Sequence, residues 1–290
     1  MNSLHPFKTH YLRQMAQVRS FSSSWKVWSP LIKEYLGASP SAQKVFDLGD
    51  NLSEIFRENA AAGRDQGSLS GGGAAWECLI SWYLKIVFWS TPICAVRQNK
   101  SYVPKVINDA VTVTISNNQT NTESDILIFS LPDEHELTGT KLSQINDHLS
   151  ERLKHVSLVN LQCKTNWKDN AQVPMLWDMI YNSESKLPHV NVGINGVTPQ
   201  SVGKFSYAFV TVPSNNFEDI KPSNVNVLRV KNLTGGNYWG RQTKSDIASS
   251  IKELFTRNFA SFFAGGVVNK IKSEMENDPD YINKFLDLDW

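Results

Sequence analysis

Three short apolar segments constrain the fold of this chain more than any other feature of its sequence. They are Asp125–Ser130 (DILIFS), Leu158–Lys164 (LVNLQCK) and Phe205–Val212 (FSYAFVTV). Each has the length of a strand, and Asp125–Ser130 is apolar enough to be buried on both faces. These segments predict the main strands of a central sheet.

Helical patterns lie before and between these strands. One helical face collects five apolar residues, Leu142, Ile145, Leu149, Leu153 and Val156, and Thr140 is placed to cap that helix. Residues 1–60 predict further helices with breaks at Pro30 and Pro40. A glycine-rich loop at residues 63–73 then precedes a helix from Ala74 to Trp89. The order of helices and strands predicts a mixed α/β fold.

Four weaker patterns complete the assignment. Val111–Ser116 (VTVTIS) alternates like a strand, and Val225–Val230 predicts another strand. Met175–Tyr181 predicts a helix, and spaced apolar residues from Ile247 to Phe262 predict a last long helix. A chain of 290 residues allows one or two domains. We place a helical N-terminal region at residues 1–70 and the core with its recognition segments at residues 71–290.

Composition excludes several classes of protein. The chain has 29 Lys or Arg and 28 Asp or Glu, so its net charge is +1 with neutral His. This balance argues against a polybasic tail but leaves room for a local basic face. Cys78, Cys94 and Cys163 show no metal-binding spacing, and their odd number argues against a disulfide framework. We therefore expect a reducing, cytoplasmic location.

Targeting and membrane segments are not expected. No acidic residue precedes Glu34, a bias that a mitochondrial transit peptide can share, but we interpret this start as a basic N-terminal helix and arm. The most apolar stretch, Trp76–Val96, contains Glu77 and Lys85. A membrane span needs about 20 mostly uncharged residues, so the sequence predicts no span and no membrane partner.

Common enzyme motifs are missing from the sequence. The six histidines form no HExxH motif and no close pair at metal-binding spacing. The sequence also contains no GxSxG, no GxxxxGK[ST] and no strand-linked GxGxxG. These absences argue against several classes of hydrolase and nucleotide-binding enzyme.

Four polar residues interrupt apolar elements. Asp125 opens a buried strand, and Glu77 lies in a helix that is otherwise nearly all apolar (AAWECLISWYL). Gln162 and Lys164 share one face of their strand, and Cys163 points to the other. Each of these residues, taken alone, is also typical of the solvent-exposed end of a strand or helix. Buried carboxylates need partners, however, so four such residues on elements that pack together favour a common site.

With Glu77 on a first helix, SDIL around Asp125 and QCK at Gln162 to Lys164, the sequence resembles the PD-(D/E)xK nuclease superfamily. Residues 160–170 (NLQCKTNWKDN) look most like type II restriction endonucleases. Gln162 stands where an acid is usual, a variant also found in the cutting subunits of some transposases. The resemblance implies a restriction-endonuclease-like α/β fold, with a central mixed β-sheet flanked by helices and, here, a helical N-terminal region.

The resemblance covers roughly residues 74–230, and two features depart from it. Ser124 stands where the family usually has proline. A predicted helix separates Asp125 from Gln162, where the family often has a hairpin.

The resemblance also implies a Mg²⁺-dependent site for phosphodiester hydrolysis. Its catalytic residues are Asp125, Gln162, Lys164 and Glu77, and its metal ligands are Asp125, Glu77 and the backbone carbonyl of Cys163. Mg²⁺ prefers such oxygen ligands, and a neutral glutamine gives the site one negative charge less than an acid would. Lys164 would hold the attacking water and stabilise charge on the phosphate.

Positive charge concentrates in residues 186–244, which contain seven Lys or Arg and two acids, a net charge of +5. Phosphate contacts need such a local surface. The region also holds eight asparagines, most of which we assign to turns. Its segment TGGNYWGRQTK is the best recognition candidate, because Arg reads guanine and Asn reads adenine. The candidate DNA-binding residues are Asn237, Tyr238, Arg241, Gln242 and Lys244. The alternative, to which we give equal weight, is a structural loop whose aromatic side chains pack against the core.

Together these observations predict a Mg²⁺-dependent, sequence-specific endonuclease that cuts double-stranded DNA as a restriction enzyme. A homodimer is expected, because two strands must be cut and two-fold DNA sites match two-fold proteins. One alternative is a repair or transposition nuclease of the same superfamily. Another is a catalytically inactive DNA-binding protein in which Gln162 marks the loss of activity.

Overall fold

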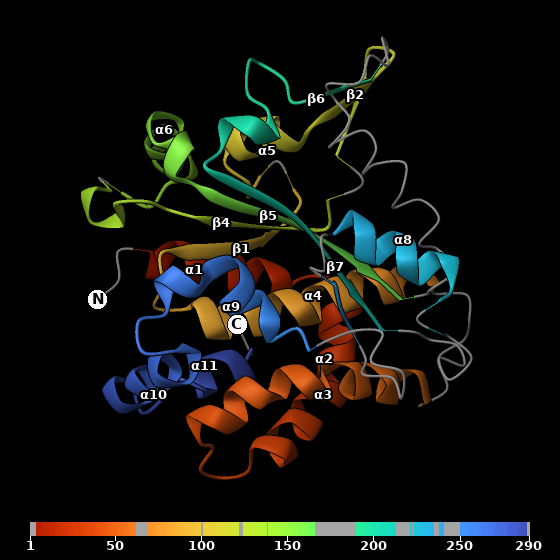
Figure 1. Ribbon diagram of the computed structural model, residues 1–290. Helices are drawn as coiled ribbons and strands as arrows, with labels where there is room; N and C mark the ends of the chain where they lie inside the picture. Colours follow the sequence, from red (N-terminus) through yellow and green to blue (C-terminus); the bar gives the residue numbers. More distant parts are fainter. Residues whose placement is uncertain are drawn as a thin grey trace.

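A computed structural model describes most of the chain. The described residues are 4–61, 69–99, 101–121, 124–137, 139–165, 190–212, 221, 223–234, 238–240 and 250–288. They form a mixed α/β fold with a five-stranded sheet, a smaller three-stranded sheet and helices on both sides (Figure 1). The α/β class and the helical N-terminal region are confirmed. None of the described helices is long and apolar enough to cross a membrane.

The five-stranded sheet has the order β1-β4-β5-β7-β8. Its strands are β1 (Ile93–Arg97), β4 (Ile126–Ser130), β5 (Ser157–Lys164), β7 (Lys204–Thr211) and β8 (Tyr238–Gly240). β1, β4 and β5 are antiparallel neighbours, whereas β7 runs parallel to β5 and β8 parallel to β7. The three strands predicted from apolar segments are confirmed. β1 was not predicted, although Ser90, Thr91 and Pro92 separate its apolar residues from those of the preceding helix, as a turn does.

The smaller sheet has the order β3-β2-β6. It contains β2 (Val113–Ile115), β3 (Asn118–Thr120) and β6 (Val190–Val192) and follows helix α5 (Lys105–Val111). Ser116 and Asn117 connect β2 to β3 with positive φ angles of 46° and 74°, the backbone that a tight hairpin turn requires. The strand predicted at residues 111–116 is therefore confirmed only in part, since Val111 ends a helix.

One face of the large sheet is covered mainly by helices from the two ends of the chain. These helices are α1 (His5–Ala16), α2 (Arg19–Leu36), α3 (Ala42–Ala61), α4 (Leu69–Phe88), α9 (Glu253–Phe259), α10 (Val267–Asn277) and α11 (Asn283–Leu286). Figure 1 shows α4 directly beneath the strands, with α2 and α3 further from the sheet. A single hydrophobic cluster joins these helices to the inward residues of β1, β4, β5 and β7. A second cluster lies on the other face, under α5 and α6 (Leu142–Glu151).

The structure corrects two predictions about where helices begin or end, the break at Pro30 and the cap at Thr140. Pro30 lies inside α2 on its exposed side, where water can satisfy the carbonyl that a proline leaves unpaired, so it does not break the helix. Pro40 does precede the start of α3. Lys141, not Thr140, is the N-cap of α6, and its backbone N–H donates to the Gln144 side chain.

Two further assignments change in the C-terminal third. The segment predicted as a strand at residues 225–230 is helix α8 (Val225–Leu233). Val227 and Val230 are buried three residues apart, as on a helix, whereas Val225 and Leu228 are exposed. The predicted last helix is shorter than expected, because α9 begins at Glu253. The helix predicted at residues 175–181 lies outside the described residues.

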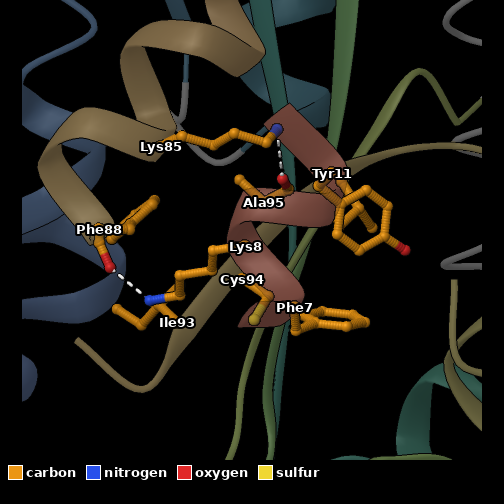
Figure 2. A pocket seen from close by; sticks show the side chains of 9 residues that line it. Phe7, Lys8, Tyr11, Lys85, Phe88, Ile93, Cys94 and Ala95 are labelled. Carbon is orange, nitrogen blue, oxygen red and sulfur yellow. Dashed lines mark hydrogen bonds between the residues drawn. The ribbon is translucent and has the colours of Figure 1, made fainter. Parts of the chain in front are cut away.

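Two buried lysines connect these elements: Lys8 connects α1 to the end of α4, and Lys85 connects α4 to β1 (Figure 2). The Nζ of Lys8 donates to the carbonyls of Phe88, Trp89 and Thr91 at 2.6, 2.9 and 2.6 Å, and so caps the C-terminal end of α4. The Nζ of Lys85 donates to Ser81 Oγ at 2.6 Å and to the Ala95 carbonyl at 3.0 Å. Burial lowers the pKa of Lys8 to about 8 and that of Lys85 to about 7.

The lowered pKa of Lys85 predicts a specific pH dependence of stability. Between the folded pKa near 7 and the ordinary lysine value of 10.5, the unfolded chain binds a proton that the folded chain lacks. The contribution of Lys85 to the free energy of unfolding therefore rises with pH across this window and is least favourable below it. We expect Lys85→Met to be most favourable relative to wild type near pH 6, with the advantage shrinking towards about pH 9.

Urea unfolding of both proteins at several pH values measures this difference. The exposed Lys154 provides the control, and Lys154→Met is expected to differ from wild type by the same amount at each pH. A constant difference for Lys85→Met would show that Lys85 does not titrate abnormally in the folded chain.

A close contact between α3 and α4 generates a second prediction. A Cβ added at Gly49 would lie 2.6 Å from the Tyr83 hydroxyl, which is fixed by its own hydrogen bond to the Phe46 carbonyl. We expect Gly49→Ala to lower stability by about 1–3 kcal/mol, although alanine favours helices, because the buried ring cannot move away. Gly73→Ala in α4 has no atom within 4 Å of its new Cβ and should stabilise the chain by up to about 1 kcal/mol. Thermal unfolding of both variants checks the opposite signs.

Candidate active site

Asp125 is fixed at the start of β4 by both neighbouring strands. Its carbonyl accepts the backbone N–H of Gln98, which follows β1, at 2.9 Å. Its Oδ2 accepts the backbone N–H of Cys163 on β5 at 2.7 Å. The preceding Ser124 is buried, and its Oγ accepts from the side chain of Asn160 at 3.0 Å. Ser124 thus helps to hold the aspartate against β5.

Gln162 and Lys164 lie on the same face of β5 as Asp125. The register pairs Ile126 with Leu161, so one further step places Asp125 opposite Gln162. Lys164 lies two residues further along and therefore on the same face. The structure thus brings together the three residues that the sequence analysis placed on adjacent strands, at the end of β5 and the beginning of β4.

The amide of Gln162 is completely buried, and its environment was not anticipated. The hydroxyl of Tyr207 on β7 donates to Gln162 Oε1 at 2.5 Å. Further along the same two strands, Thr211 is paired with Lys164. The Oγ1 of Thr211 and the Oδ1 of Asn160 are buried and find no hydrogen-bond partner among the described residues. The face that carries Gln162 and Lys164 therefore retains polar atoms that can accept further hydrogen bonds.

Glu77 has the partner that its position in an apolar helix requires. Its Oε2 accepts from the Nη2 and Nε of Arg97 at 2.6 and 3.1 Å. Arg97 ends β1, so this ion pair joins α4 to the edge strand of the sheet. Burial alone would lower the pKa of Arg97, but Cys78 and Glu77 outweigh burial and raise it. Sequence reasoning predicted the need for a partner but did not identify Arg97.

Four charged side chains affect the pKa of the buried Cys163 thiol. Burial raises its pKa well above the ordinary value, and the carboxylates of Asp125 and Glu77 raise it further. Lys164 and Arg97 act in the opposite direction. The thiol therefore stays protonated at neutral pH, which argues against a cysteine nucleophile.

The side chains at this site provide few oxygen ligands, so they suit only a cation that keeps several bound waters. The described residues contain no group of three or more His, Cys, Asp or Glu that could hold a metal ion. Asp125 and Gln162 instead offer one carboxylate and one amide oxygen on neighbouring strands, and Glu77 is engaged by Arg97. Mg²⁺ commonly binds through one or two carboxylates and keeps several waters. The residues fit such an ion, with the carbonyl of Cys163 as a further oxygen.

Of the predicted DNA-binding segment, residues 234–244, the structure describes only residues 234 and 238–240. Tyr238 belongs to β8, which adds a strand to the large sheet beside β7. Asn237, Arg241, Gln242 and Lys244 lie outside the described residues, as does Lys186 of the basic region. Their assignment to DNA binding stays a prediction.

Comparisons of the chain with protein family models, curated proteins and solved structures found no match. The interpretation of the site therefore depends on its own geometry and on the residues that compose it.

The ion pair between Glu77 and Arg97 predicts a measurable contribution to stability. The two side chains are 19% and 28% exposed, so removing one leaves a largely desolvated charge. We expect Arg97→Met to lower the free energy of unfolding by about 1–3 kcal/mol. Adding Glu77→Gln should recover part of that loss, because it removes the unpaired charge.

A surface ion pair provides the matched control for this prediction. Lys33 and Asp287 are 52% and 59% exposed, so Lys33→Met should change stability by about 0.5 kcal/mol or less. Equal effects of Arg97→Met and Lys33→Met in urea unfolding would contradict a structural role for the Glu77–Arg97 pair.

Proposed function

We propose that this protein is a Mg²⁺-dependent, sequence-specific endonuclease that hydrolyses both strands of DNA in a restriction system. The observation that supports the proposal most is the placement of Asp125, Gln162 and Lys164 on one face at the junction of β4 and β5. A mixed sheet flanked by helices is also what a restriction-endonuclease-like fold requires. A homodimer on a two-fold DNA site is part of the same proposal.

Each residue has a defined role in this proposal. Asp125, Gln162 and the Cys163 carbonyl would hold the metal ion, whereas Glu77 stays paired with Arg97 on the face of the sheet that packs against α4. When bound, Mg²⁺ lowers the pKa of a coordinated water and neutralises charge on the phosphodiester. The ammonium of Lys164 orients the attacking water and stabilises the negative charge that develops on the phosphate. Tyr207 positions the Gln162 amide through its hydrogen bond.

One set of observations favours a second function, a DNA-binding protein that has lost catalysis. The Gln162 amide is buried against Tyr207, and Glu77 is held by Arg97. Both contacts satisfy groups that a metal ion would otherwise use. Asp125 and Lys164 nevertheless provide the carboxylate and the ammonium that hydrolysis needs, and we therefore favour the active enzyme.

Cleavage of supercoiled plasmid DNA with Mg²⁺ tests the proposal. We expect wild-type protein to linearise a plasmid that contains its site and to lose this activity in EDTA. Asp125→Asn and Lys164→Ala should each reduce cleavage by about 10²-fold or more, because each removes a group that stabilises the transition state. Asp133→Asn and Lys154→Ala alter exposed residues outside the site and should cut like wild type.

Wild-type-like cleavage by Asp125→Asn or Lys164→Ala would place the chemistry elsewhere. Binding of duplex DNA without cleavage, in wild-type protein and variants alike, would assign the second function.

A further inference from the structure

The small sheet β3-β2-β6 presents an uncharged polar surface. Figure 1 shows β2 and β6 extending away from the five-stranded sheet, towards the upper right of the view. Residues 113–121 (VTISNNQTN) and 190–203 (VNVGINGVTPQSVG) contain no charged side chain. This uncharged stretch offers a partner hydrogen-bond donors and acceptors rather than charge.

One face of this sheet carries a row of three hydrogen-bonding side chains. Thr114 in the central strand is paired with Gln119 on β3 and with Asn191 on β6. Paired residues of antiparallel strands share a face, so these three form one line across the sheet, here called the amide row. Gln119 and Asn191 are exposed, and Thr114 is half-buried. Val113 and Val192 lie on the opposite face and are buried.

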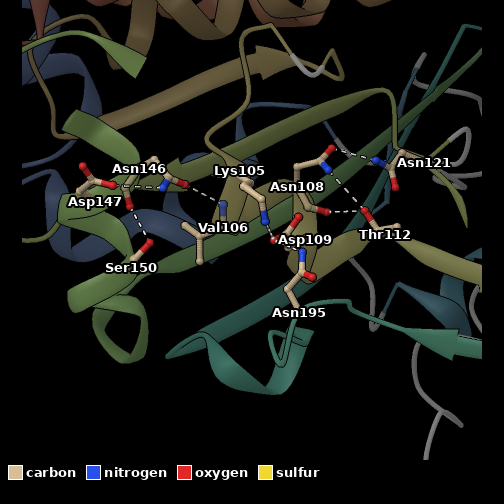
Figure 3. A network of polar contacts seen from close by, with 10 residues as sticks. All are labelled: Lys105, Val106, Asn108, Asp109, Thr112, Asn121, Asn146, Asp147, Ser150 and Asn195. Carbon is tan, nitrogen blue, oxygen red and sulfur yellow. Dashed lines mark hydrogen bonds and ion pairs between the residues drawn. The ribbon is translucent and has the colours of Figure 1, made fainter. Parts of the chain in front are cut away.

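The base of the sheet is held firmly by α5. The backbone N–H of Gly193 donates to the Thr112 carbonyl at 2.8 Å, and that of Ile194 donates to the Asp109 carbonyl at 3.1 Å. The side chain of Asn195 also donates to the Asp109 carboxylate at 2.9 Å (Figure 3). These contacts fix the orientation of the amide row before any ligand binds.

A short chain of hydrogen bonds connects the sheet to the candidate active site. Asn121, the residue after β3, donates from its side chain to Asn108 Oδ1 at 2.8 Å (Figure 3). The Gln98 side chain donates to the same oxygen at 2.8 Å. The backbone N–H of Gln98 donates in turn to the carbonyl of Asp125. The small sheet and the backbone of Asp125 are therefore joined through Asn108 and Gln98.

We propose that the small sheet enters the major groove of double-stranded DNA and that the amide row reads base edges there. This inference rests on the proposed function and names the surface that supplies its specificity. The major groove admits a β-ribbon, and Asn or Gln pairs bidentately with adenine, whereas the threonine methyl can contact thymine. The amide row therefore favours A·T base pairs. Phosphate contacts, which position the protein, come from other basic residues.

The chemistry of the surface favours duplex DNA over other macromolecules. The deep and narrow major groove of A-form RNA does not admit side chains for base reading. The centre of a protein interface is typically apolar and aromatic, whereas the amide row contains neither kind of side chain. No carboxylate lies on β2, β3 or β6 that would repel phosphates.

Selection from a pool of random-sequence duplexes in EDTA tests this inference without requiring cleavage. We expect wild-type protein to enrich a motif that contains A·T pairs. Gln119→Ala and Asn191→Ala should each reduce the preference for adenine at one position of each half-site by about tenfold, the discrimination of one bidentate contact. Both variants should keep the salt dependence of binding to unselected DNA, because no phosphate contact is lost.

Two further variants separate base reading from a structural role. Asn118→Ala removes an amide from the adjacent residue, which points to the opposite face of β3, and should leave the motif unchanged. Gln119→Glu should shift the preference at its position from adenine to cytosine, because a carboxylate accepts from the cytosine amino group. A variant that had merely damaged the fold would not gain a new preference.

The outcomes distinguish this inference from the proposed function. If wild-type protein binds no duplex, both fail. If it enriches a motif that Gln119→Ala, Asn191→Ala and Gln119→Glu leave unchanged, the inference alone is wrong and another segment reads the DNA. The same unchanged motif, together with an altered oligomeric state of the variants, would assign the small sheet to a protein contact and would also overturn the inference.

Discussion

The burial of α4 between the large sheet and the other helices is the constraint on which the rest of the structure depends. Trp76, Trp82 and Tyr83 are each 1% exposed or less, and the helix contacts β1 and β5 on one side and α2 and α3 on the other. A helix that is apolar all round can be accommodated only inside such a layered structure. Its few polar groups then require partners within the protein, because they are largely removed from water.

Those partners organise the candidate active site. Glu77 is matched by Arg97 at the end of β1, and Lys85 by the Ala95 carbonyl on the same strand. β1 is thereby fixed against α4, and the Gln98 N–H that follows it holds the backbone of Asp125. The position of the proposed catalytic aspartate is thus a consequence of how the helix satisfies its buried charges.

Sequence reasoning succeeded where a residue's environment follows from its own segment. The strand at residues 126–130 is apolar on both faces, and those at residues 157–164 and 204–211 are mostly apolar, so their burial could be predicted, and the period of two placed Gln162 and Lys164 together. It failed where the deciding contact comes from elsewhere in the chain. Tyr207 as the partner of Gln162 and Arg97 as the partner of Glu77 are tertiary contacts between segments that no local pattern connects. The helix at residues 225–233 was predicted as a strand because its valines suit strands locally, whereas the packing of Val227 and Val230 favours a helix.

In the proposed function, Asp125 and Gln162 bind a divalent cation. The most direct measurement is an anomalous difference map from crystals of the wild-type protein soaked with Mn²⁺, with Asp125→Asn crystals treated identically. We expect an anomalous peak within coordination distance of an Asp125 carboxylate oxygen and the Gln162 amide oxygen. This peak should be absent or much weaker in the Asp125→Asn crystals. A map with no peak at the junction of β4 and β5, in crystals that bind Mn²⁺ elsewhere, would contradict it.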